Sequence, residues 1–139
     1  MAKVLIIGGG GREHAIGDSI RKDREVDKVF YAPGNAGTAL DDKCENLPID
    51  GTKKENFQKI FDYVDREGID LVVVGPEQPL VNGIVEKFDM YMYKNIFGPT
   101  SGASLIEADK FYSYALMKKC GIPQAESIMC RSIEDAITA

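Results

Sequence analysis

The sequence predicts an α/β fold, an open and mostly parallel sheet with helices on both faces. Apolar runs and amphipathic stretches alternate along the chain, which is the pattern of successive βαβ units. The run at 4–7 is continuously apolar, as strands covered on both faces are, and 69–74 is the clearest buried strand. A glycine follows each of these two segments, which marks the end of the strand.

The remaining elements follow from local patterns. Strands are expected at 4–7, 26–32, 69–74 and 96–97, with a weaker extended segment at 44–49. Helices are expected at 12–22, 52–67 and 81–92, and a longer helical stretch at 104–119 allows a break in its middle. A last helix opens at 132–135 and reaches the final residue, Ala139. The stretch after Pro123 therefore reads as the start of a new unit, and we expect the chain to be a piece of a longer protein.

The second helix carries the clearest start and stop signals. Thr52 and Glu55 have the spacing of a capping box, and Gly68 follows the last helical residue. Four apolar residues recur at helical spacing and are predicted to face the core, namely Phe57, Ile60, Phe61 and Val64.

Composition excludes several classes of protein. The net charge of −5 argues against a nucleic-acid-binding surface, which is usually basic. No apolar stretch approaches the roughly 20 residues that span a bilayer. Three widely spaced cysteines without a signal peptide predict reduced thiols and a cytoplasmic protein, and a single histidine leaves little material for a zinc site.

Four consecutive glycines, Gly8 to Gly11, lie where the first strand meets the first helix. Bare N–H groups at a helix N-terminus form an anion site, because unpaired donors and the helix dipole point the same way. A tight turn without a ligand would need only one glycine. We therefore predict that Gly9, Gly10 and Gly11 donate to a phosphate group and that Arg12 adds charge.

The loop does not match the two commonest nucleotide motifs. In the dinucleotide fingerprint G-x-G-x-x-G, the third glycine would fall on Glu13 or on His14. The second predicted strand ends in Ala32-Pro33-Gly34, without the acidic residue that holds a ribose, and the Walker pattern is absent. A smaller phosphorylated ligand is predicted, and an oxidoreductase-type dinucleotide domain is disfavoured.

Three loops follow predicted strands and outline one cleft, at 8–13, 33–38 and 75–80. In the second loop, Asn35 and Thr38 can hydrogen-bond a ribose, and Gly34 and Gly37 allow a close approach; the alternative is a plain turn.

Three further polar residues are associated with the cleft. Glu77 either receives an amine or a ribose hydroxyl, or is a surface carboxylate that caps the next helix. Glu13 either caps its own helix or accepts from a sugar hydroxyl. His14 is predicted to be structural.

Four segments carry a resemblance: G-G-G-G-R-E-H-A at 8–15, P-G-N-A-G-T at 33–38, G-P-E-Q-P-L-V-N-G-I at 75–84 and F-G-P-T at 97–100. Together they resemble the phosphoribosylamine–glycine ligase family, also called glycinamide ribonucleotide synthetase. The resemblance implies a Rossmann-like front domain of ATP-grasp ligases. Residues 1–104 would be the phosphoribosylamine-binding α/β domain, and 105–139 a connecting helix and the start of a truncated ATP-grasp region.

The family's reaction implies the substrates. Magnesium-bound ATP activates the carboxylate of glycine as an acyl phosphate, and the amine of 5-phosphoribosylamine attacks it in purine biosynthesis. ATP and Mg²⁺ would be bound mainly by the region that follows, so no catalytic residue or metal ligand is assigned here and the chain alone is expected to be inactive. The family usually has Gly-Ser before a lysine where this chain has Ala108-Asp109-Lys110, which leaves the role of Lys110 open.

Two alternatives remain at this stage. One is another ATP-grasp ligase with the same front domain, although such ligases would be expected to diverge at 33–38 and 75–84. The other is a stand-alone binding module for a phosphorylated sugar or nucleotide. The sequence assigns no oligomeric state.

Overall fold

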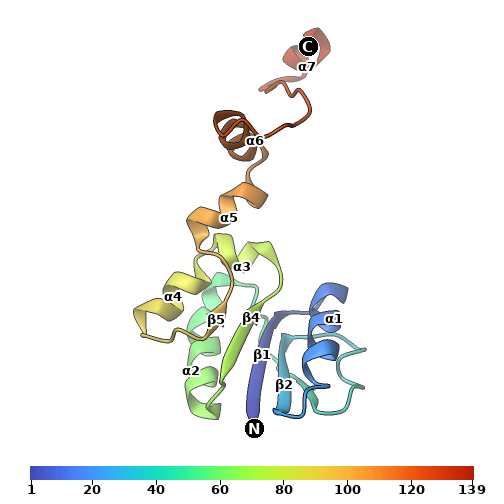
Figure 1. Ribbon diagram of the computed structural model, residues 1–139, viewed down its shortest axis with the longest axis vertical. Helices are drawn as coiled ribbons and strands as arrows, with labels where there is room; N and C mark the ends of the chain where they lie inside the picture. Colours follow the sequence, from blue (N-terminus) through green and yellow to red (C-terminus); the bar gives the residue numbers. More distant parts are fainter. The chain divides into compact units, whose positions relative to one another are not determined.

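A five-stranded sheet with the order β3-β2-β1-β4-β5 is the centre of the fold, and all of its neighbouring strands are parallel. The computed structural model describes residues 1–139 (Figure 1). It has two compact units, Met1–Ser104, which contains the sheet, and Leu105–Ala139. The strands are β1 (Ala2–Gly8), β2 (Val26–Pro33), β3 (Cys44–Asn46), β4 (Leu71–Val74) and β5 (Ile96–Phe97).

Strand order reverses at β1, which pairs with β2 on one side and β4 on the other. Ile7 lies opposite both Ala32 and Val74, and Gly8 lies opposite Pro33. The loops that follow these three strands therefore start side by side at one edge of the sheet. In open parallel sheets this edge, at the point of reversal, is where ligands bind.

Helices cover both faces of the sheet, as predicted. Side chains alternate along β1, so that Val4 and Ile6 pack on one face and Leu5 and Ile7 on the other. The first face is covered by α1 (Gly11–Ile20) through Ile16 and Ile20. Figure 1 shows α1 and α2 on opposite sides of the sheet. The second face is covered by the helices α2 (Phe57–Glu67), α3 (Glu77–Val81) and α4 (Ile84–Met90).

The predicted capping box at Thr52 is not formed, and α2 starts later than expected. Asp50 accepts hydrogen bonds from the backbone N–H and the hydroxyl of Thr52, at 3.1 and 2.6 Å. This local turn takes the hydroxyl that would have capped a helix, so the chain continues through a 3₁₀ turn at Lys54–Asn56 before α2. The predicted end is confirmed, because Gly68 is left-handed with φ 62°.

The segment after β4 also differs from the prediction. Residues 75–80 were expected as a loop, but Glu77 is the first residue of the short helix α3. Pro76 precedes the helix, and Pro79 lies in its first turn, where a missing N–H costs no intrahelical bond. The helix expected at 81–92 is divided by Gly83, which has φ 82°, so that α4 begins at Ile84.

The helical stretch expected at 104–119 is broken at Asp109, between α5 (Ser101–Ala108) and α6 (Lys110–Lys119). The Asp109 carboxylate caps α6 by accepting from the N–H groups of Phe111 and Tyr112. The last helix, α7 (Ile133–Thr138), is capped by Ser132. All three cysteines are free, and none of the helices is long and apolar enough to cross a membrane.

Candidate functional site

The fold requires three of the four glycines at the junction of β1 and α1, each for a different reason. Gly8 has φ 118°, a conformation that strains other residues. A Cβ atom on Gly9 would overlap the carbonyl oxygen of Gly34, and one on Gly10 would meet the Glu13 carboxylate at 2.8 Å. A Cβ atom on Gly11 would meet nothing within 4 Å. The fold therefore explains the first three glycines, and Gly11 alone borders open space.

Glu13 caps its own helix, which is one of the two roles that the sequence allowed. Its side chain is 5% exposed, and one carboxylate oxygen accepts the N–H of Gly10 at 2.6 Å. Gly10 was predicted to donate to a phosphate, but in this structure its donor is already paired. The open donors are those of the first helical turn, because the first intrahelical bond runs from His14 N to Gly10 O.

Arg12 is exposed at this helix N-terminus and joins two of the three loops. Its guanidinium donates to the carbonyl oxygen of Gly75 at 3.0 Å, across the boundary between β1 and β4. The carbonyl group orients the side chain while leaving its charge uncompensated. Arg12 thus supplies positive charge beside the unpaired N–H groups of Gly11 and of its own backbone.

The loop after β2 is built around Asn35. Its side-chain oxygen accepts from the N–H groups of Gly37 and Thr38, at 2.7 and 3.1 Å, and its amide donates to Gly9 O at 3.0 Å. Gly34 also donates its N–H to Gly8 O at 3.1 Å. These bonds attach the second loop to the glycine loop, so Gly34, Asn35 and the glycine loop form one surface.

Thr38 was predicted to contact a ribose, but it has no exposed surface. Its hydroxyl oxygen accepts from Asn35 N and lies 2.7 Å from Asn46 Oδ1. Thr38 therefore shapes the loop from inside. Asn46, which sequence reasoning missed, donates to Asn35 O at 2.7 Å and borders Gly34. The only signal for it was a polar residue at the end of a weak strand.

His14 has a structural role here, as predicted. Its Nε2 atom lies 2.8 Å from Asp41 Oδ2. Its ring lies so close to Gly37 that a Cβ atom there would meet His14 Nδ1 at 2.9 Å. This contact is the reason for glycine at 37, and it holds α1 against the second loop.

Glu77 is exposed and has no hydrogen-bond or ion-pair partner in the structure. It lies in the first turn of α3, where a carboxylate interacts favourably with the helix dipole. Because α3 directly follows β4, Glu77 lies at the same sheet edge as the other two loops.

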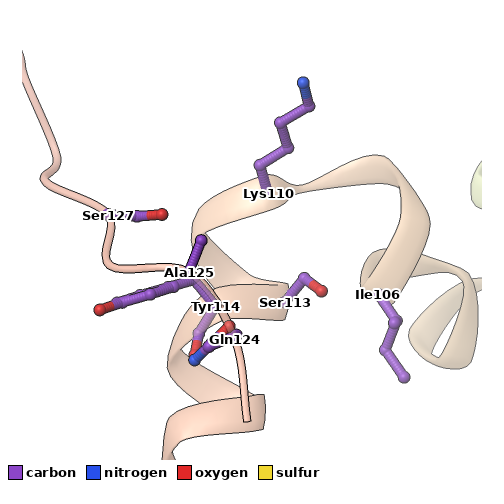
Figure 2. A pocket seen from close by; sticks show the side chains of 7 residues that line it. All are labelled: Ile106, Lys110, Ser113, Tyr114, Gln124, Ala125 and Ser127. Atoms are coloured by element: carbon purple, nitrogen blue, oxygen red, sulfur yellow. The ribbon is translucent and has the colours of Figure 1, made fainter.

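The second unit contains a separate open pocket of about 240 Å³ beside α6 (Figure 2). Ala125 and Ser127 of the following extended segment face Ser113 and Tyr114 of the helix. Lys110, also in the lining, forms no ion pair, and the neighbouring Asp109 carboxylate caps α6. The hydroxyls and the lysine suit phosphate oxygens, but the pocket is smaller than the roughly 300–1,000 Å³ of sites for larger ligands. No group of three or more His, Cys, Asp or Glu residues could hold a metal ion.

Solved structures share this fold. The biotin carboxylase subunit of pyruvate carboxylase matches 98% of this chain with a TM-score of 0.61 at 22% identity, over 32% of its own length. The biotin carboxylase domain of a thermophilic 2-oxoglutarate carboxylase matches with the same TM-score at 16% identity. At these identities the likeness concerns the fold, and the Rossmann-like α/β class predicted from sequence is confirmed.

Sequence relatives give a closer assignment. A protein named phosphoribosylamine–glycine ligase from Pseudomonas putida is 43% identical over 97% of this chain. Proteins of the same name from Clostridium acetobutylicum and Escherichia coli strain K12 are 38% and 42% identical. The chain spans about 30% of the length of these curated relatives. The family model described as phosphoribosylglycinamide synthetase, N domain, matches residues 2–107, so the chain belongs to this family.

Proposed function

We propose that the chain is the N-terminal, substrate-binding part of an ATP-dependent ligase that joins glycine to 5-phosphoribosylamine. The products would be glycinamide ribonucleotide, ADP and phosphate, in a cytoplasmic pathway of purine biosynthesis. Family membership and the names of the relatives support this reaction. The domain of residues 1–104 would hold phosphoribosylamine, and 105–139 would begin the ATP-grasp region.

Gly11 is the observation that best supports a phosphate at the glycine loop. It is the one glycine of the four whose missing side chain the protein does not itself require. The space it leaves lies at a helix N-terminus, next to Arg12 and at the point where strand order reverses. Unpaired N–H groups, the helix dipole and a guanidinium all favour an anion there.

The neighbouring loops would receive the rest of the substrate. With the phosphate at Gly11 and Arg12, the ribose would lie along Gly34 and Asn35, which hydrogen bonds join to the glycine loop. Glu77 has no partner within the protein, so its carboxylate is free to accept from the amine or from a ribose hydroxyl. In this arrangement five residues would support the loops from the protein side without contacting the ligand, namely Gly9, Gly10, Glu13, Gly37 and Thr38.

ATP, when bound with Mg²⁺, would supply the phosphoryl group that activates the glycine carboxylate. In this chain, the hydroxyls of Ser113 and Ser127 in the pocket beside α6 would hold phosphate oxygens, and Lys110 of the same lining would add positive charge. The chain offers no acidic cluster for the metal, so the region beyond it in the longer relatives would provide those ligands.

Calorimetric titration of the chain with ribose 5-phosphate, a stable stand-in for phosphoribosylamine, tests the phosphate site. Gly11→Ala is expected to weaken binding at least about tenfold, because a methyl group would occupy the space for the phosphate. Its thermal stability should not fall, since alanine is a better helix former than glycine.

Gly102→Ala is the matched control for this titration. Gly102 lies near the start of α5, where a Cβ atom also meets nothing within 4 Å. This variant should bind ribose 5-phosphate as the wild type does. A wild-type chain that binds no ribose 5-phosphate at millimolar concentration, or a Gly11→Ala variant that binds it normally, would contradict the proposed site.

A further inference from the structure

Glu13 occupies the position at which a dinucleotide-binding loop has its third small residue. Counted from Gly8, the fingerprint G-x-G-x-x-G/A places glycine at 8 and 10 as required and Glu13 at the last position. In dinucleotide sites the last residue is small so that the helix packs closely on the strand, and the middle glycine lets the backbone approach the pyrophosphate. This chain keeps the fold and two of the three glycines but not the third.

The Glu13 side chain fills the space at the reversal of strand order. Its Cγ atom lies 2.8 Å from where a Cβ atom on Gly8 would be, at the end of β1. Its carboxyl carbon lies 2.7 Å from the corresponding position on Gly75, at the end of β4. The side chain is therefore inserted over the ends of both central strands, and it is buried.

The carboxylate also takes the backbone donor of the middle glycine. Gly10 N–H donates to Glu13 Oε2 at 2.6 Å, in the place where a pyrophosphate oxygen would accept. A second phosphate group at this point would have to displace a buried side chain and break its hydrogen bond with Gly10 N–H, the donor that the phosphate itself would need.

We propose that Glu13 is a specificity-determining residue that limits this site to a single terminal phosphate group. It acts as an internal substitute for the second phosphate and leaves only the donors at Gly11 and Arg12 for a ligand. The proposal rests on the proposed function, because it requires a phosphate at the glycine loop. The class of ligand it admits is the sugar 5-phosphate, and the class it rejects is the pyrophosphate-bridged dinucleotide.

Ribose 5-phosphate and ADP-ribose form a matched pair of probes, because ADP-ribose carries the same sugar phosphate extended through a pyrophosphate. We expect the wild type to bind ribose 5-phosphate at least about tenfold more tightly in calorimetric titrations. Glu13→Ala, which completes the fingerprint, should reduce this preference at least about tenfold. Glu13→Gln keeps the size of the side chain and an acceptor for Gly10, so its preference should stay within about threefold of the wild type.

A measurement on the wild type alone keeps the test independent of variants that do not fold. On saturation with ribose 5-phosphate, the amide resonances of Gly11 and Arg12 should shift, whereas that of Gly10 should not, because its donor remains on Glu13. A large shift or loss of exchange protection at Gly10 would overturn the proposal.

The possible failures are distinguishable. If the wild type binds neither probe, the proposed function fails and the role of Glu13 falls with it. If the wild type binds ribose 5-phosphate and folded Glu13→Ala keeps the wild-type preference, only the role of Glu13 is overturned. If Glu13→Gln loses the preference as fully as Glu13→Ala, charge alone accounts for it and occupation of the Gly10 donor is refuted.

Discussion

Met1–Ser104 contains every buried residue of this chain, whereas Leu105–Ala139 contains none. The first unit has two apolar clusters, one on each face of the sheet. In the second unit, large apolar side chains such as Phe111, Ile128 and Ile133 are exposed. Its helices are held instead by local caps, from Asp109 to α6 and from Ser132 to α7.

This difference shows two ways in which a sequence can specify a helix. The helix α2 is amphipathic and gains its stability by burying one face, as Ile60 and Val64 do. The helices α6 and α7 have clear start signals but contain no fully buried residue, so local interactions contribute most of their stability. Changes to packing should therefore act on the first unit, and changes to capping on the second.

Isoleucine-to-alanine substitutions in the two units are expected to differ most in their effect on the free energy of unfolding. Ile60→Ala removes a fully buried side chain from the core and should lower the free energy of unfolding by about 3–4 kcal/mol. Ile133→Ala removes a side chain that is 82% exposed and should change it by less than about 0.5 kcal/mol. Urea denaturation followed by circular dichroism measures both, and comparable losses would show that Ile133 is buried in solution.

Substitution of two glycines with left-handed backbone conformations, one in each unit, should give a second and smaller difference in stability. Gly34 has φ 76° and borders Asn46, whereas Gly121 has φ 67° with nothing within 4 Å of a Cβ atom. Gly34→Ala combines backbone strain with overlap and should cost about 2–3 kcal/mol in urea denaturation. Gly121→Ala involves strain alone and should cost at most about 1 kcal/mol, confined to the end of α6. Equal global destabilisation by both would mean that crowding at Asn46 contributes nothing.

Much of the fold is predictable because its signals are short-range and agree with one another. The apolar run of β1, the left-handed Gly68 and the break before Lys110 each depend on neighbours within a few residues. The errors arise where two local signals compete. Thr52 could cap a helix, but Asp50 lies closer in the chain and takes its hydroxyl.

The site is less predictable because it depends on contacts between loops. The sequence places four glycines in a row, but only packing against Gly34 and Glu13 shows that Gly11 alone borders open space. Asn46 and Asp41 support the site from outside the motifs, since Asn46 follows Thr38 by 8 residues and Asp41 follows His14 by 27. No local pattern marks them, since an isolated polar residue near a strand end is common.

Acid should change the effects of two hydroxyl-removing substitutions, one in each unit. These changes in stability are the smallest that we expect. The hydroxyl of Thr52 hydrogen-bonds Asp50 and lowers the pKa of its carboxyl, so the stability this bond adds is present above the unfolded-state pKa of about 3.9. It is lost as pH falls through the lower folded-state pKa. Thr52→Ala should therefore be less stable than the wild type at pH 6 in urea denaturation, and the difference should disappear near about pH 2.

The matched change in the second unit is Ser132→Ala. The Arg131 backbone N–H and the Ser132 hydroxyl lower the pKa of Asp135 in the same direction, so the sign of the pH dependence is the same. Because α7 buries nothing, this variant should leave the urea transition unchanged at both pH values. It should accelerate amide exchange within Ile133–Thr138 relative to the wild type, and more at pH 6 than under acid conditions, because the lost cap bond from Asp135 N–H does not titrate whereas the bond to the Asp135 carboxylate does. A shift of the global transition by Ser132→Ala would instead couple α7 to the sheet domain, and the contrast between the units would no longer hold.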